Sequence, residues 1–302
     1  HRWGGTENYT AGLAREFAAR GASVRVLCAG DWDTGPAHDN GCQDTVHEGV
    51  PVRRLNLNWT KARDPFRCLF DNPVAGEALD ALLDQDRPDV VHVTSCETLS
   101  ARVLTVARRR GLPLVLSLTD FWFLCPRINL LRADGGNCSG RTTAWDCTRC
   151  LAGHTRAVRW LRALLPETPA RRALSAVGKT PSLSRLRGLR GMVGDVEGRK
   201  RCLTHALALP DVRITASPFV RRVHEEGGIT APITVQPYGH ELSWLASFPG
   251  REPSPVLRLG YVGQMLPSKG VHVLLDAVGR LRSVGLSFML VWGYSLDLWQ
   301  IG

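Results

Sequence analysis

A loop near the end of the sequence carries groups that could bind phosphate. It reads GQMLPSKG at residues 263–270, after an apolar, strand-like run and before a predicted helix. A turn from strand to helix directs backbone N–H groups and the positive end of the helix dipole at one point, which suits an anion. Lys269 adds a compact cation that could reach a diphosphate. The loop matches neither the Walker A nor the GxGxxG pattern, and a solvated lysine at a helix start is the alternative interpretation.

A carboxylate and a glycine pair are further candidates for chemistry. Asp120 follows the apolar run at residues 112–118, and open α/β sheets bind ligands beyond the carboxyl ends of their strands. A carboxylate there could orient an acceptor hydroxyl or take its proton, unless it only forms the turn after the strand. Gly4 and Gly5 precede a predicted helix, and without side chains they let a ligand approach the backbone closely.

Four cysteines are spaced as metal ligands can be. Cys125, Cys138, Cys147 and Cys150 form a C-x12-C-x8-C-x2-C pattern around a polar, glycine-rich segment that could not pack by itself. The CxxC pair can bind one metal ion, and four thiolates would complete a closed, structural zinc site. An iron–sulfur cluster, disulfides and free thiols stay open as alternatives.

The elements that would position these residues alternate between helix and strand. Short apolar strands separated by amphipathic helices predict βαβ units and a doubly wound parallel sheet, and therefore an α/β fold. The predicted helices are one that starts after Gly5 and is ended by Gly21, and residues 73–83, 99–109 and 270–281; the predicted strands are residues 23–28, 51–57, 90–93, 112–118, 212–217, 233–236, 257–262 and 286–292.

Composition divides the chain into two predicted domains. Residues 1–245 form an N-terminal domain with a cysteine-rich and basic insertion at about 121–205, which we expect to be helical around 158–165. Proline and glycine mark a linker at 246–256. Residues 257–302 supply one βαβ unit, too little to bury the core of a full domain, so we expect the second domain to be incomplete.

The positive charge of the chain is concentrated in one segment. The net charge is +10, and residues 151–202 hold 12 Lys and Arg against 3 Asp and Glu. Such a segment could contact an acidic partner or an anionic membrane surface, or form a solvated face. No apolar run is long enough to predict a membrane span, and the opening residues lack the apolar region of a signal peptide. The nine cysteines are too sparse for a disulfide scaffold. We therefore expect a cytoplasmic protein, peripheral on the inner face of the membrane if the basic segment binds lipid.

Four segments together resemble one enzyme family. RLGYVGQMLPSKGVHVLLDAVGRL resembles the first strand, loop and helix of the C-terminal domain in family-four retaining glycosyltransferases of GT-B fold. GGTENYTAGLAREFAARGASVRVLC is similar to their first loop and helix. SLTDFWFLCPRINLLRADGGNCSG resembles a subgroup whose strand ends in His-Asp-Phe-Trp or Thr-Asp-Phe-Trp, and SPFVRRVHEEGGITAPITVQPYGHEL resembles the end of the N-terminal domain. The four segments occur in the order of the family.

The resemblance implies a GT-B-like pair of Rossmann-like domains that transfer a sugar from a nucleotide-diphosphate donor to an acceptor hydroxyl. Asp120 would act on the acceptor, and Thr119 stands where some relatives have a histidine base. Anomeric configuration would be retained without a catalytic divalent metal, which leaves structural zinc as the one cofactor to consider. The strand before Gly4 and a downstream pair of glutamates are expected outside these residues, so we expect this fragment to be inactive alone. The implied donor-binding residues are Gly4, Gly5, Gly263, Lys269 and Gln264, the last where many members have arginine.

Two other functions are compatible with parts of the sequence. The four cysteines and the basic segment could form a zinc-containing nucleic-acid-binding module. Few aromatic residues and no known finger spacing occur there, so we expect no nucleic-acid partner. A dinucleotide-dependent oxidoreductase would carry a GxGxxG fingerprint, which follows none of the predicted strands.

Overall fold

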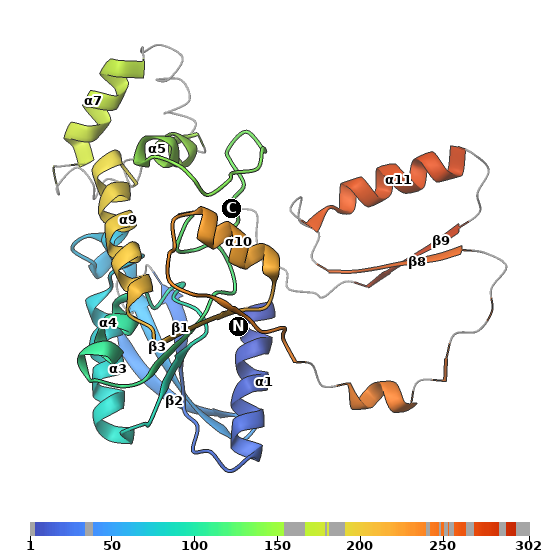
Figure 1. The fold of residues 1–302 in the computed structure, drawn as a ribbon, viewed down its shortest axis with the longest axis horizontal. Coiled ribbons are helices and arrows are strands. Elements are labelled where there is room, and N and C mark those ends of the chain that lie inside the picture. Colours follow the sequence, from blue (N-terminus) through green and yellow to red (C-terminus); the bar gives the residue numbers. More distant parts are fainter. Residues whose placement is uncertain are drawn as a thin grey trace. The chain divides into compact units, whose positions relative to one another are not determined.

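The protein is described by a computed structural model that divides into two compact units, Gly4–Gly239 and His240–Gly302 with His1–Trp3 (Figure 1). The structure describes residues 4–33, 39–153, 167–178, 180, 191–239, 242–247, 249–250, 253, 257–263, 269–283 and 288–293.

The first unit contains a three-stranded mixed sheet. Its strand order is β1-β3-β2, with β1 parallel and β2 antiparallel to β3. Glu48 and Gly49 join β2 to β3 with φ values of 48° and 82°, the left-handed pair that a two-residue hairpin turn requires. The sequence analysis did not predict β2, which is largely exposed. The strands are β1 (Val26–Asp33), β2 (Gly41–His47) and β3 (Val50–Asn58).

A four-stranded parallel sheet forms the centre of the first unit. Its order is β4-β5-β6-β7, and every neighbouring pair is parallel. Leu114 and Leu116 of β5 are fully buried, as expected for a strand covered by helices on both faces. This sheet confirms the predicted α/β fold with parallel strands. The strands are β4 (Val91–Val93), β5 (Leu114–Ser117), β6 (Val212–Thr215) and β7 (Thr234–Val235).

Helices connect these strands. α1 (Gly5–Ala19), α3 (Pro73–Asp86) and α4 (Arg102–Arg109) correspond to helices predicted from the sequence, whereas α10 (Pro218–Glu226) was not among them. α4 begins three residues later than predicted, because Thr98 and Ser100 have φ values of 74° and 66° and cannot be helical. The short η1 (Trp59–Lys61) and α2 (Pro65–Cys68) lead from β3 into α3. No helix within the described ranges combines the length and the apolarity needed to cross a membrane.

The last part of the predicted insertion belongs to the core. α9 (Val193–Ala208) buries Val196 and Leu203 completely, in the same cluster as Leu104 and Leu116. α5 (Ala144–Ala152) and α7 (Glu167–Gly178) pack beside α9 (Figure 1). The helix expected around residues 158–165 lies outside the described residues. The residues of α9 were counted in the predicted insertion at about 121–205, and in the structure they contribute to the core of the first unit.

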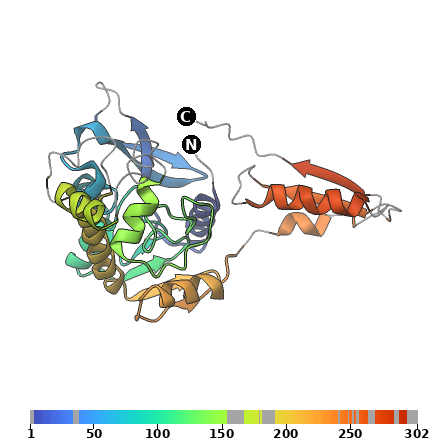
Figure 2. The same cartoon turned by 90° about the horizontal axis from the view of Figure 1, so that it is seen from above.

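The second unit contains one βαβ element, as predicted. β8 (Leu257–Val262) and β9 (Phe288–Gly293) are parallel and in register from Leu257–Phe288 to Val262–Gly293. α11 (Val271–Ser283) connects them and lies along the pair (Figure 2). A short 3-10 helix, η2 (Ser243–Ser247), precedes the element.

Candidate functional site at the carboxyl edge of the parallel sheet

The first turns of α1 contact the residue that follows β4, and this residue in turn contacts one that follows β5. The hydroxyls of Thr10 and Thr94 lie 2.7 Å apart, and the Thr119 hydroxyl donates to the Thr94 carbonyl at 3.3 Å. Thr94 follows β4 and Thr119 follows β5, so both lie beyond the carboxyl ends of parallel strands. This edge is where open α/β sheets bind ligands. The structure therefore joins α1 to the edge that carries Asp120.

Two tyrosines from opposite ends of the first unit pack against each other at this edge. The ring centroids of Tyr9 in α1 and Tyr238 after β7 lie 4.3 Å apart, with an interplanar angle of 34°. Burial raises the pKa of Tyr238, and the neighbouring Tyr9 and Asp120 act in the same direction. Tyr238 is thus within electrostatic range of Asp120. The sequence analysis did not identify either tyrosine as a site residue. The one feature of the sequence that could have indicated them is that each lies next to a predicted motif.

A short polar chain supports the tyrosine pair. The Tyr9 hydroxyl lies 3.2 Å from Ser117 Oγ, and His92 Nε2 lies 2.8 Å from the same oxygen. Burial lowers the pKa of His92, so this imidazole is neutral at neutral pH and one of its nitrogens can accept a hydrogen bond. The chain links α1, β5 and β4 and fixes the position of the Tyr9 ring.

Asp120 occupies the turn directly after the central strand. Its Oδ1 accepts a hydrogen bond from the Trp122 N–H at 2.7 Å. Burial raises the pKa of Asp120, while that hydrogen bond and the charge of Arg199 oppose the shift. The turn-forming role considered in the sequence analysis is present. The raised pKa also makes this carboxylate a better proton acceptor than an exposed one.

Arg199 is a buried cation that contacts this turn. It is 3% exposed, its guanidinium lies 5.2 Å from the centroid of the Trp122 ring, and its Nη2 donates to the Trp122 carbonyl. Burial lowers the pKa of Arg199 to about 10, so it is charged at neutral pH. Sequence analysis placed it in a basic segment suited to a surface, and the structure corrects that placement.

The predicted glycine pair forms the start of α1. Gly4 is the N-cap, and its N–H is bound by Glu7 Oε2 at 3.0 Å. A Cβ at Gly5 would meet nothing within 4 Å, so the space above this position is open. Glu7 is therefore a capping carboxylate, and the first turn of α1 presents further N–H groups at its positive end.

The predicted donor-loop residues belong to the second unit. Gly263 follows β8, and Lys269 is exposed shortly before α11. Gln264 lies outside the described residues. The convergence of Lys269 with Gly5 on one diphosphate stays a prediction.

The four clustered cysteines lie between β5 and α9. Cys147 is buried in α5, and its sulfur lies 3.0 Å from the Thr142 hydroxyl. The sulfur of Cys125 accepts the Arg127 N–H at 3.4 Å. All nine cysteines are free thiols. Within the described ranges no three His, Cys, Asp or Glu side chains are arranged to hold a metal ion. A zinc site formed by Cys125, Cys138, Cys147 and Cys150 stays a prediction.

A solved structure of a protein described as a UDP-N-acetylglucosamine 2-epimerase, from Listeria monocytogenes, aligns with a TM-score of 0.28 and 11% identity. The alignment covers 80% of this chain and 48% of that protein. No curated protein matches. Residues 4–178 match the profile of the Glycosyl transferase 4-like domain. This match spans more than half of the chain, and the chain therefore belongs to the glycosyl transferase 4-like family.

Proposed function

We propose that the protein transfers a sugar from a nucleotide-diphosphate donor to an acceptor hydroxyl, with retention of anomeric configuration. Family membership supports glycosyl transfer in general. The observation that carries the proposal within this fold is Asp120, a partly buried carboxylate with a raised pKa directly after the buried strand β5. It lies at the edge where the first turns of α1 contact the sheet.

Asp120 would act on the acceptor. A carboxylate can orient a hydroxyl by accepting its hydrogen bond and can take its proton as the glycosidic bond forms. Its raised pKa brings the group closer to neutral pH, which favours proton transfer. The tilted, closely packed rings of Tyr9 and Tyr238 offer apolar surface near the carboxylate, and sugar rings bind through such faces together with hydrogen bonds.

The donor diphosphate would be held by electrostatic contacts alone. The first turn of α1 supplies N–H groups at the positive helix end, beside the open space at Gly5. Lys269 would supply a cation from the second unit. Stabilising the charge that develops on the leaving diphosphate is the largest expected contribution to the rate, on the order of 3 kcal/mol for each well-placed donor.

Membrane contact and cellular location are separate proposals. The nucleic-acid-binding and oxidoreductase alternatives gain nothing from the family assignment. Contact between the basic segment and anionic lipid rests on charge, and buried Arg199 cannot contribute to it. We also propose a cytoplasmic location.

Turnover and binding test the proposal together. The protein in its natural full length is incubated with UDP-, GDP- and ADP-sugars, and release of nucleoside diphosphate is measured with and without sugar acceptors. We expect Asp120→Asn to lower kcat by roughly 100-fold or more and Lys269→Ala to weaken donor binding and turnover. Asp84→Asn and Arg280→Ala are the matched controls, because they remove a charge from α3 and from α11. Wild-type kinetics in both Asp120→Asn and Lys269→Ala would refute the assigned roles.

A further inference from the structure

A cavity opens in the first unit among residues that follow β3 and β4. Its volume is about 520 Å³, within the range of small-molecule sites. The end of β3, η1, α2 and the starts of α3 and α4 contribute to its lining. Leu57, Trp59 and Val74 give it an apolar side. The cavity does not include Asp120 or the tyrosine pair.

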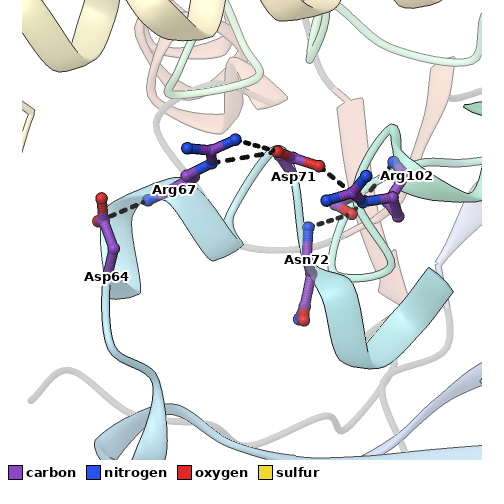
Figure 3. Close-up of polar contacts among 6 residues, drawn as sticks. Asp64, Arg67, Asp71, Asn72 and Arg102 are labelled. Carbon is purple, nitrogen blue, oxygen red and sulfur yellow. Dashed lines mark hydrogen bonds and ion pairs between the residues drawn. The ribbon is translucent and has the colours of Figure 1, made fainter. Parts of the chain in front are cut away.

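Two arginines on the cavity wall share one carboxylate (Figure 3). Arg67 Nη2 and Nε lie 2.9 and 3.1 Å from Asp71 Oδ2, and Arg102 Nε lies 2.9 Å from Asp71 Oδ1. The Arg102 contact is an ion pair without hydrogen-bond alignment, so its buried Nε–H has no acceptor. Each guanidinium has five N–H donors. One carboxylate therefore orients two guanidiniums and leaves several of their donors for a ligand.

The backbone holds this pair in place. Ser100 is fully buried, and its hydroxyl accepts the N–H of Asn72 at 2.8 Å and of Arg102 at 3.3 Å. Ser100 has a φ of 66°, which bends the chain between β4 and α4. A Cβ at Gly76 would lie 2.5 Å from Arg102 Cγ, so this glycine leaves room for the arginine. The arrangement is built before any ligand binds.

The charge of the lining selects the class of ligand. Lys61, Arg63, Arg67 and Arg102 line the cavity against Asp64 and Asp71, an excess of two positive charges. Lys61 also pairs with Asp39, an exposed residue outside the lining. A phosphate monoester carries nearly two negative charges at neutral pH, whereas a carboxylate carries one. Arginine forks bind phosphate through paired hydrogen bonds. A small dianion with an apolar or planar body fits this wall and the side formed by Trp59.

We propose that this cavity binds a phosphate monoester of a small molecule, with the phosphate held by Arg67 and Arg102 and the body against Trp59. The site is separate from Asp120, and the proposal stands independently of glycosyl transfer. It assigns a second ligand-binding function to the first unit.

A matched pair of probes tests the proposal by isothermal titration calorimetry. Phenyl phosphate and benzoate share one ring and differ in the anion. We expect phenyl phosphate to bind at least roughly tenfold more tightly than benzoate. Arg67→Gln and Arg102→Gln should each weaken phenyl phosphate by a similar factor. Arg67 is well exposed, so its variant should fold even if Arg102→Gln does not. Arg108→Gln, which removes an arginine paired with Asp211 outside the cavity, should bind as the wild type does.

Vesicles containing phosphatidate separate the two sources of a phosphate monoester. Sedimentation of the wild type but not of Arg67→Gln with the vesicles would assign a lipid headgroup. Absence of sedimentation, with phenyl phosphate still bound, would assign a soluble ligand. Equal affinity for the two probes, no binding of phenyl phosphate, or binding unchanged in Arg67→Gln would overturn the proposal. None of these results requires donor turnover, so they leave the transferase assignment untouched.

Discussion

Arg199 contacts both the side chain and the backbone of Trp122. Its guanidinium lies 5.2 Å from the centroid of the indole ring, and its Nη2 donates a hydrogen bond to the carbonyl of the same residue. The N–H of Trp122 in turn binds Asp120. A buried side chain on α9 therefore positions the turn that carries the candidate acceptor-binding carboxylate. Arg199 is a positioning residue, because it acts on Asp120 through Trp122.

Arg199→Ala should lower the free energy of unfolding by about 3 kcal/mol. The substitution leaves the Trp122 carbonyl without its charged donor and removes the stem packed beneath the ring. Urea denaturation followed by circular dichroism measures the change. Arg201→Ala, two residues along the same helix and exposed, should change stability by less than about 0.5 kcal/mol. Equal small losses in the two variants would show that the contact with Trp122 contributes little.

A positioning role also predicts a partial rescue by lysine. Arg199→Lys keeps the charge but cannot reproduce the planar guanidinium over the indole. We expect it to recover part of the stability lost in Arg199→Ala, while kcat stays lower than in the wild type and KM for the donor is unchanged. Recovery of stability together with full kcat would mean that Arg199 serves the fold and does not position Asp120.

Asp120 should make stability depend on pH in a definite direction. Burial raises its folded pKa above the ordinary 3.8, so the folded protein binds this proton more tightly than the unfolded chain does. The stabilisation is complete below that ordinary value and is lost as pH rises through the folded pKa. Asp120→Asn removes the titration and keeps an acceptor for the Trp122 N–H. The stability of the variant relative to wild type should therefore increase with pH across this window, by about 1.4 kcal/mol for each unit of pKa shift.

Urea denaturation of both proteins at several pH values, from below the ordinary pKa of aspartate to neutral pH, measures this difference in stability. Asp84→Asn is the control, since Asp84 is mostly exposed and pairs with Arg110. A pH-independent difference between Asp120→Asn and wild type would show that the carboxyl is not raised. If Asp120 is the base, kcat should fall on the acid side of the pH profile with a midpoint above the ordinary pKa of an exposed aspartate.

Tyr9 and Tyr238 should be coupled energetically. Aromatic pairs at this separation contribute about 1 kcal/mol beyond their buried area. A double-mutant cycle of Tyr9→Leu and Tyr238→Leu should give a coupling energy of that size. Tyr9→Phe keeps the ring and loses only the contact with Ser117. The coupling energy between a phenylalanine at position 9 and Tyr238 should therefore equal the coupling energy between Tyr9 and Tyr238. Additive single losses would indicate that the rings touch without mutual stabilisation.

Local pattern was enough to predict most strands and helices of this fold. An unbroken apolar run predicted the buried strand β5, and the alternation of strands and helices indicated parallel strands. β2 carries no such signal, because GCQDTVH is polar and mostly exposed. It is a strand because β3 pairs with it through the left-handed turn at Glu48 and Gly49. Such pairing is a property of two segments, which a window along one segment cannot detect.

The candidate site was predictable only in part for the same reason. Asp120 was found because a strand end is a local feature. Tyr9 and Tyr238 meet only when α1 and the end of β7 come together. Arg199 looked like one charge among many in a basic segment, and its burial depends on the face that α9 turns toward Trp122. Contacts between distant segments decide which polar residues share a site.

The zinc content of the purified protein tests whether the four clustered cysteines form a metal site. Cys147 and Cys150 are one turn apart on α5, so both thiols lie on one face of that helix. The Arg127 N–H already binds the sulfur of Cys125, and such donors stabilise thiolates. If the four thiols close around zinc, the purified protein should contain about one zinc ion per chain. Cys147→Ser should lose the metal and the associated stability.

Cys42→Ser is the matched control for this experiment, because Cys42 is an exposed thiol on β2. It should retain zinc and unfold at the temperature of the wild type. Chelation should lower the unfolding temperature of the wild type and of Cys42→Ser, and should leave Cys147→Ser unchanged. All three proteins are prepared without chelator and supplied with zinc. If wild type, Cys42→Ser and Cys147→Ser then contain no metal and unfold at the same temperature, the cysteines are free thiols and form no metal site. In that case the loop after Asp120 is ordered by Arg199 and by the packing of α5 on α9 alone.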